Sequence, residues 1–129
     1  MAKPKINIEV ESYGLYSTWN RDSKELPEIR EFTYNIPAVA DNEFGYILHI
    51  KKGKGQKIEF KIKHPNIPDE HNNIMEPFTG EVFINSNDFR FYIGDCIWEP
   101  VENKTGIWEI TTYLDKKEIV KKSFTVSLH

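Results

Sequence analysis

The stretch FGYILHIKKGKGQKIEFKIK, residues 44–63, contains the clearest structural signal in the chain. Phe44, Tyr46, Leu48 and Ile50 occupy alternate positions, and after two glycines the apolar alternation resumes at positions 58, 60 and 62. A period of two is typical of a strand with one buried face, and glycine suits the backbone of a tight turn. The stretch therefore predicts two strands joined as a hairpin.

Similar alternation predicts short strands along the rest of the chain. Residues 6–16 form the first, with a bend or bulge at Gly14, and residues 30–35 form the second, stopped by Ile36-Pro37. Further short strands are expected at 81–84 and 89–93 around a turn, and at 96–98. The last two, 107–114 and 118–128, form a second hairpin, with Trp108 in the core and three inward residues in its final strand: Phe124, Val126 and Leu128.

About seven to eight short strands separated by turn residues are typical of an all-β fold. No stretch has the pattern of a helix of about ten residues. We expect an immunoglobulin-like antiparallel β-sandwich with little or no helix, formed as a single domain over residues 1–129. A sandwich is favoured over a closed barrel because prolines and loop residues interrupt the pairing.

Composition excludes several classes of protein. Aromatic residues make up 13% of the chain, which argues against disorder, and a net charge of -3 provides no general field for binding nucleic acid. Cys96 is the only cysteine, so no intramolecular disulfide is possible. No signal peptide or membrane span is visible, and we expect a cytoplasmic protein without nucleic-acid or membrane partners and without a cofactor.

Short motifs across the chain resemble a bacterial family known as domain of unknown function 3859. The resemblance implies an immunoglobulin-like β domain and no activity. Its last part, a Gly-x-Trp strand followed by a turn and a Phe-x-Val strand, looks like the end of many immunoglobulin-like modules. The matching residues are Tyr13-Gly14-Leu15-Tyr16, Ile36-Pro37-Ala38, Phe44-Gly45, His64-Pro65, Tyr92 with Gly94, Gly106-x-Trp108 and Phe124-Thr125-Val126.

The long irregular connection over residues 64–77 carries side chains that bind zinc or act as acid and base: His64, Asp69, Glu70, His71 and Glu76. Their spacing does not place ligands on a common face, and polar loops collect such residues by default. A metal site or a small hydrolase remains an alternative. We expect His64 to hydrogen-bond to backbone and to end the hairpin, because the residue before Pro65 is held extended.

Six lysines give the 51–63 segment a local charge of +5, six lysines less Glu59: Lys51, Lys52, Lys54, Lys57, Lys61 and Lys63. Such a run could meet an acidic partner, but alternation places several of them on a solvated strand face, where lysine discourages unwanted pairing. We favour the solvated face.

Trp19 and Trp98 could stack on a sugar, which would require both rings to be exposed and roughly coplanar.

No catalytic motif outweighs a structural explanation of the same residues. We therefore expect a non-enzymatic binding or protein-interaction module whose partner is another protein or a second copy of the chain. The candidate partner surface is an exposed strand edge or the long loops, and the candidate residues are His64, Asp69, Glu70, His71, Trp19 and Trp98. A small metal-dependent or hydrolytic enzyme using residues 64–76, and a carbohydrate-binding module, are the alternatives.

Overall fold

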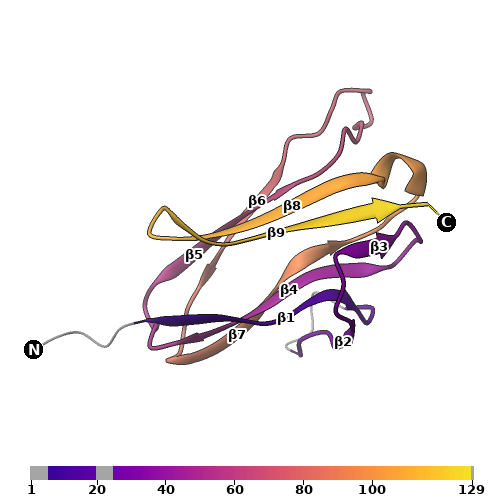
Figure 1. Cartoon of the computed structure of the whole chain (residues 1–129). Coiled ribbons are helices and arrows are strands. Elements are labelled where there is room, and N and C mark those ends of the chain that lie inside the picture. The colour runs from indigo at the N-terminus through magenta and orange to yellow at the C-terminus, as the bar shows by residue number, and fades with distance from the viewer. Residues whose placement is uncertain (1–5, 20–24, 129) are drawn as a thin grey trace, which may run out of the picture.

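The computed structural model of the chain describes residues 6–19 and 25–128, and its regular secondary structure is almost entirely β-strand (Figure 1). One 3₁₀ helix, η1 (Val101–Lys104), interrupts them. In chain order the strands are β1 (Asn7–Tyr16), β2 (Ile29–Glu31), β3 (Asn35–Pro37), β4 (Glu43–Lys51), β5 (Lys57–Lys63), β6 (Phe78–Phe83), β7 (Asp88–Cys96), β8 (Gly106–Leu114) and β9 (Lys117–Ser127).

The strands form two sheets that pack as two layers, which Figure 1 shows edge-on. The first sheet has the order β2-β1-β4-β7, and the second has the order β3-β9-β8-β5-β6. Every pair is antiparallel except β3 with β9, which run parallel. The predicted β-sandwich is confirmed, with nine strands in the described residues where about seven to eight were expected.

The hairpin predicted for residues 44–63 is wrong. β4 pairs with β1 and β7 in the first sheet, whereas β5 pairs with β6 and β8 in the second. Residues 52–56 cross between the sheets, and residues 84–87 cross beside them in the opposite direction, so the turn predicted there does not join neighbouring strands either. The two crossings are hydrogen-bonded, with Gly55 N–H donating to Ile84 O at 2.8 Å and Ile84 N–H donating to Gln56 O at 2.8 Å.

The single strand predicted over residues 30–35 is also wrong, because the chain changes sheets within it. β2 lies at the edge of the first sheet, β3 lies at the edge of the second, and residues 32–34 pass between them. Pro37 is the last residue of β3 instead of a stop before it. An edge position tolerates proline, which lacks a backbone donor.

The core lies between the two layers and is built from large rings. Trp108, Phe44 and Phe124 are fully buried, and the rings of Phe44 and Trp108 meet edge to face with centroids 5.2 Å apart. The predicted inward positions of Trp108, Phe124 and Val126 are confirmed. Leu128 is exposed, contrary to prediction, because it follows the last paired residue of β9.

β1 contains a bulge, though not at the residue predicted. The register slips between Val10 and Ser12, so Tyr13 and Leu15 face the core while Gly14 faces outward. Gly14 has φ +127°, and a Cβ there would lie 2.1 Å from the carbonyl oxygen of Glu31. Glycine therefore lets the chain after β2 pass directly over β1. Across the described residues, no helix is long and apolar enough to span a membrane.

Candidate functional site

The 64–77 loop joins β5 to β6, which are neighbours in the second sheet. His64 lies at its start, with Nδ1 2.6 Å from Pro65 O and Nε2 2.9 Å from Glu76 O. The ring also packs against Phe78, with centroids 4.8 Å apart. The predicted backbone hydrogen bonding of His64 is confirmed, and the imidazole ties the two ends of the loop together.

The other polar side chains of this loop do not converge. Asp69 Oδ1 accepts from the backbone N–H groups of His71 and Asn73 at 2.8 and 2.9 Å, which folds the tip of the loop. The side chains of Glu70 and His71 are exposed, and His71 Nε2 lies 3.5 Å from Glu70 Oε1. Within residues 6–19 and 25–128, no group of three histidine, cysteine or acidic side chains is placed to hold a metal ion.

The lysine run of residues 51–63 does not form a basic surface. Lys51 and Lys52 border the first sheet, whereas Lys57, Lys61 and Lys63 lie on the second. Lys57 Nζ is 3.0 Å from the carboxylate of Glu81, and Lys63 Nζ is 3.8 Å from that of Glu109. These cross-strand pairs fit the solvated face expected from the sequence.

Trp19 and Trp98 belong to separate clusters. Trp19 packs on the outer face of the first sheet, where its Nε1 donates to Glu25 O at 2.7 Å and its ring meets Tyr92 edge-on at 5.0 Å. Trp98 packs against the interlayer core, at 6.4 Å from Trp108. Both rings are half-buried, so they do not form the exposed coplanar pair that sugar binding would require.

Lys104, which sequence analysis did not single out, is only 1% exposed. Its ammonium group lies 4.3 Å from the ring centre of Trp98 and donates to Pro100 O at 3.0 Å. Burial lowers the pKa of Lys104, and the nearby carboxylates of Glu99 and Glu102 oppose that shift. The amine therefore links the start of η1, at Pro100, to the ring of Trp98, and these contacts explain its burial by structure alone.

Three glycines from the family motifs form one row across the first sheet. Gly14 pairs with Gly45, and Gly45 pairs with Gly94. A Cβ on Gly94 would lie 2.2 Å from the hydroxyl oxygen of Tyr92, so the absent side chain lets the Tyr92 ring lie along its own strand. The Tyr92 hydroxyl lies 2.7 Å from both Glu43 Oε2 and Phe44 O, which fixes the ring over the sheet.

Both flanks of the sandwich have strand edges without a neighbour among the described residues: β6 and β7 at one flank, and most of the length of β1 and β9 at the other. In the described part of the chain, β2 pairs with β1 only at Leu15 and Tyr16, and β3 pairs with β9 only over residues 125–127. The remaining lengths of β1 and β9, residues 7–14 and 117–124, are unpaired on that side. We call this side the open flank. Figure 1 shows both strands, with the chain passing from β2 to β3 at one end.

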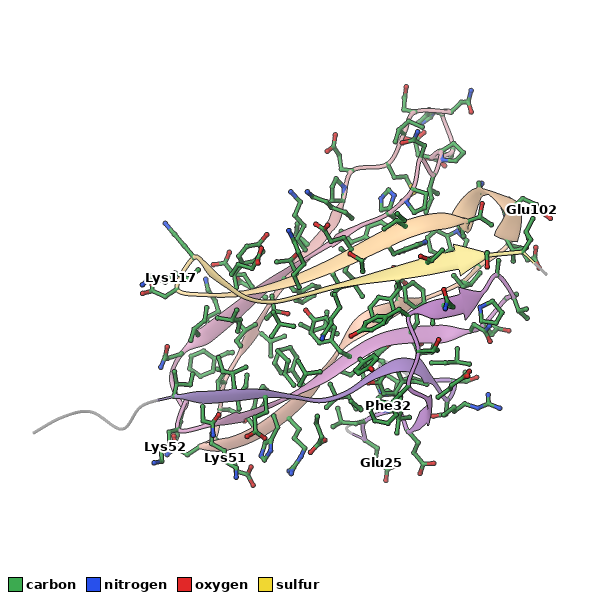
Figure 2. The ribbon with its side chains drawn as sticks, in the orientation of Figure 1. Glu25, Phe32, Lys51, Lys52, Glu102 and Lys117 are labelled. Carbon is green, nitrogen blue, oxygen red and sulfur yellow. The ribbon has the colours of Figure 1, made fainter. Side chains whose placement is uncertain are left out.

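Aromatic rings and one lysine gather where the chain crosses the open flank, and we call Tyr13, Phe32, Tyr34 and Lys122 the flank cluster. The rings of Tyr13 and Tyr34 stack at 4.6 Å, and Phe32 meets Tyr13 edge-on at 5.3 Å. Phe32, labelled in Figure 2, is 56% exposed, and Tyr34 is 39% exposed. Tyr34 also contacts the core ring of Phe124 at 5.6 Å, so the flank cluster extends the core to the surface.

Sequence analysis missed the flank cluster because it assigned residues 30–35 to one strand. Two signals were present. Phe32 and Tyr34 alternate, so an extended backbone places both rings on one side. Lys122 is two residues before Phe124, so it also faces inward; it is paired with the buried Ile110.

The two layers and their connections define an immunoglobulin-like β-sandwich. A crystal structure of an immunoglobulin-like protein, PA1606 from Pseudomonas aeruginosa, is similar to 98% of this chain and 100% of its own chain, with a TM-score of 0.77 and 17% sequence identity. The chain belongs to the family described as domain of unknown function DUF3859, whose model matches residues 4–126. This confirms the resemblance drawn from the short motifs. No curated protein matches the chain.

Proposed function

We propose that the protein is a non-enzymatic protein-interaction module that binds its partner through the flank cluster and the adjoining edge of β9. The observation that carries the proposal is the exposure of Phe32 and Tyr34 beside a length of strand edge that no described strand covers. Exposed aromatic groups that cluster, instead of being scattered singly, favour an interaction surface.

The unpaired edge of β9 adds a second means of recognition. Thr125 N–H donates to Tyr34 O at 2.7 Å, and Ala38 N–H donates to Ser127 O at 2.9 Å, so the backbone at these two β9 residues faces β3. Alternation along the strand then directs the backbone groups of Ser123 and Lys121 to the same side, where no described strand lies. Groups of this kind accept an added strand from a partner.

The two alternative functions have less support. For an enzyme, the acid and base side chains of the 64–76 segment would have to converge, but His64 and Asp69 are engaged with backbone groups and His71 extends into solvent. For sugar binding, Trp19 and Trp98 would have to share a surface. The proposed module acts in the cytoplasm, as the lone cysteine suggests.

Site-specific photocrosslinking in the cells that make the protein tests the proposal. A benzophenone amino acid replaces Phe32 in one variant and Phe83 in the control, because Phe83 is 62% exposed but lies on β6 at the other flank. We expect a discrete protein adduct from position 32 that is absent from position 83 and is lost when Tyr34→Ser is added. Equal adducts at both positions, or none at position 32, would contradict the proposal.

A further inference from the structure

We infer that the partner segment bound at the open flank is an extended acidic peptide, whose carboxylate pairs with Lys122 while its backbone continues the line of β3 along β9. This inference rests on the proposed function and adds the chemistry of the partner. Three features of the described residues support it: an uncompensated cation, an open row of backbone groups, and obstacles to other occupants.

Lys122 is a cation with no acidic partner in the part of the chain that the structure describes. Its Nζ donates to the Tyr34 hydroxyl at 3.2 Å and lies 5.3 and 5.7 Å from the ring centres of Tyr13 and Tyr34. Among the described residues it forms no ion pair, whereas the adjacent Lys121 lies 3.6 Å from both Glu109 and Glu118. A carboxylate brought to Lys122 would form a charge-assisted hydrogen bond beside apolar rings, where such bonds are strong.

The position of Lys122 suits recognition of a strand. It points between the layers from β9, and its stem lies on the same face as Phe124 and Val120. A peptide paired with the edge at Lys121 and Ser123 would place alternate side chains toward the seam between the sheets. One of those side chains would meet Lys122, and the next would meet the exposed ring of Phe32 or Tyr34.

Other occupants fit this surface less well. Antiparallel pairing of β9 with β9 of a second copy, in the registers centred at Lys121 and Lys122, would bring like charges together, which disfavours a homodimer in those registers. A flat sugar needs free ring faces, but Tyr13 and Tyr34 stack on each other with planes 12° apart. An extended acidic peptide would pair its carboxylate with Lys122 and its backbone with the open groups of Lys121 and Ser123.

Selection of a phage-displayed library of random peptides on the full chain tests the inference. We expect enriched peptides to carry Asp or Glu within an alternating apolar pattern, and to shift the backbone amide signals of Lys121 and Ser123 in NMR spectra. Lys122→Met, which keeps the length of the stem, should weaken binding about 10- to 100-fold, as expected for a lost charge-assisted hydrogen bond. The matched control Lys121→Met should change affinity less than about threefold.

Enrichment of neutral or basic peptides, equal loss in the Lys121→Met control, shifts mapped away from β9, or no selected peptide would each overturn the inference. The photocrosslinking result then separates the two claims. An adduct at position 32 without acidic peptide binding leaves the interaction module standing and removes only the acidic strand. Loss of both results rejects the proposed function as well.

Discussion

Gly14 shows how one residue determines which path the chain can take. It has φ +127°, and its missing Cβ leaves room for Glu31 O at 2.1 Å and Thr33 N at 2.7 Å from the ideal Cβ position. Gly55 provides a matched comparison, because it also has a positive φ, +93°, but nothing lies within 4 Å of its ideal Cβ. The two positions separate backbone strain from a steric clash.

Gly14→Ala should therefore lower the free energy of unfolding more than Gly55→Ala. Strain alone accounts for about 1–3 kcal/mol in either variant, and the clash at Gly14 adds to it because the crossing segment must move. Urea unfolding followed by tryptophan fluorescence measures both. Equal losses of the free energy of unfolding in the two variants would show that residues 31–33 do not clash with a side chain at position 14. If Gly14→Ala fails to fold while Gly55→Ala folds, the ranking is upheld.

At the scale of strands, the sequence pattern identifies which residues face the core but does not identify which strands pair. Alternation at Leu48 and Ile58 correctly identified the core-facing side of each strand, but Ile47 on the opposite side of β4 is buried as well. The same period arises whether two strands are neighbours or face each other across the core. The partners of β4 and β5 therefore could not be derived from the pattern, and the glycines between them looked like a hairpin turn.

The candidate site depended on the same missing information. The backbone bonding of His64 followed from local sequence, since Pro65 holds the preceding residue extended. The flank cluster joins Tyr13, Phe32 and Lys122, which come from β1, a crossing segment and β9. Their meeting depends on topology that only the folded chain shows.

The turn between β8 and β9 is a true hairpin and gives a prediction about an element. Asp115 and Lys116 have φ +51° and +65°, the arrangement of a two-residue type I′ turn, which favours Asn-Gly. The double variant Asp115→Asn with Lys116→Gly should raise the free energy of unfolding by about 0.4–1 kcal/mol, because glycine relieves the positive φ of Lys116. A higher urea midpoint with an unchanged slope is expected. A lower midpoint would mean that the native side chains stabilise this turn by other contacts.

At the scale of the whole molecule, both faces of the first sheet bury a tyrosine. Tyr46 faces the core and is hydrogen-bonded to Thr112, and Tyr16 lies on the outer face with its hydroxyl 2.8 Å from Ser12 Oγ. Burial raises the pKa of Tyr16 to about 12 from its ordinary value of 10.0, and burial also raises the pKa of Tyr46. The folded state therefore holds both phenol protons more tightly than the unfolded chain does.

The free energy of unfolding should consequently fall as pH rises from about 10 toward 12, because the unfolded chain loses its phenol protons first. The fall is at most about 1.4 kcal/mol per pH unit for each tyrosine. Tyr16→Phe removes one ionisable phenol and should flatten this decline. Ser12→Ala is the control, since it removes the same hydrogen bond but keeps the phenol, and it should lower stability without flattening the decline. Urea unfolding at a series of pH values measures each slope. If the slope of the free energy of unfolding against pH is unchanged in Tyr16→Phe, the outer face of the first sheet opens to water before the sandwich unfolds. The residues packed over Tyr16 would then not belong to the cooperative unit.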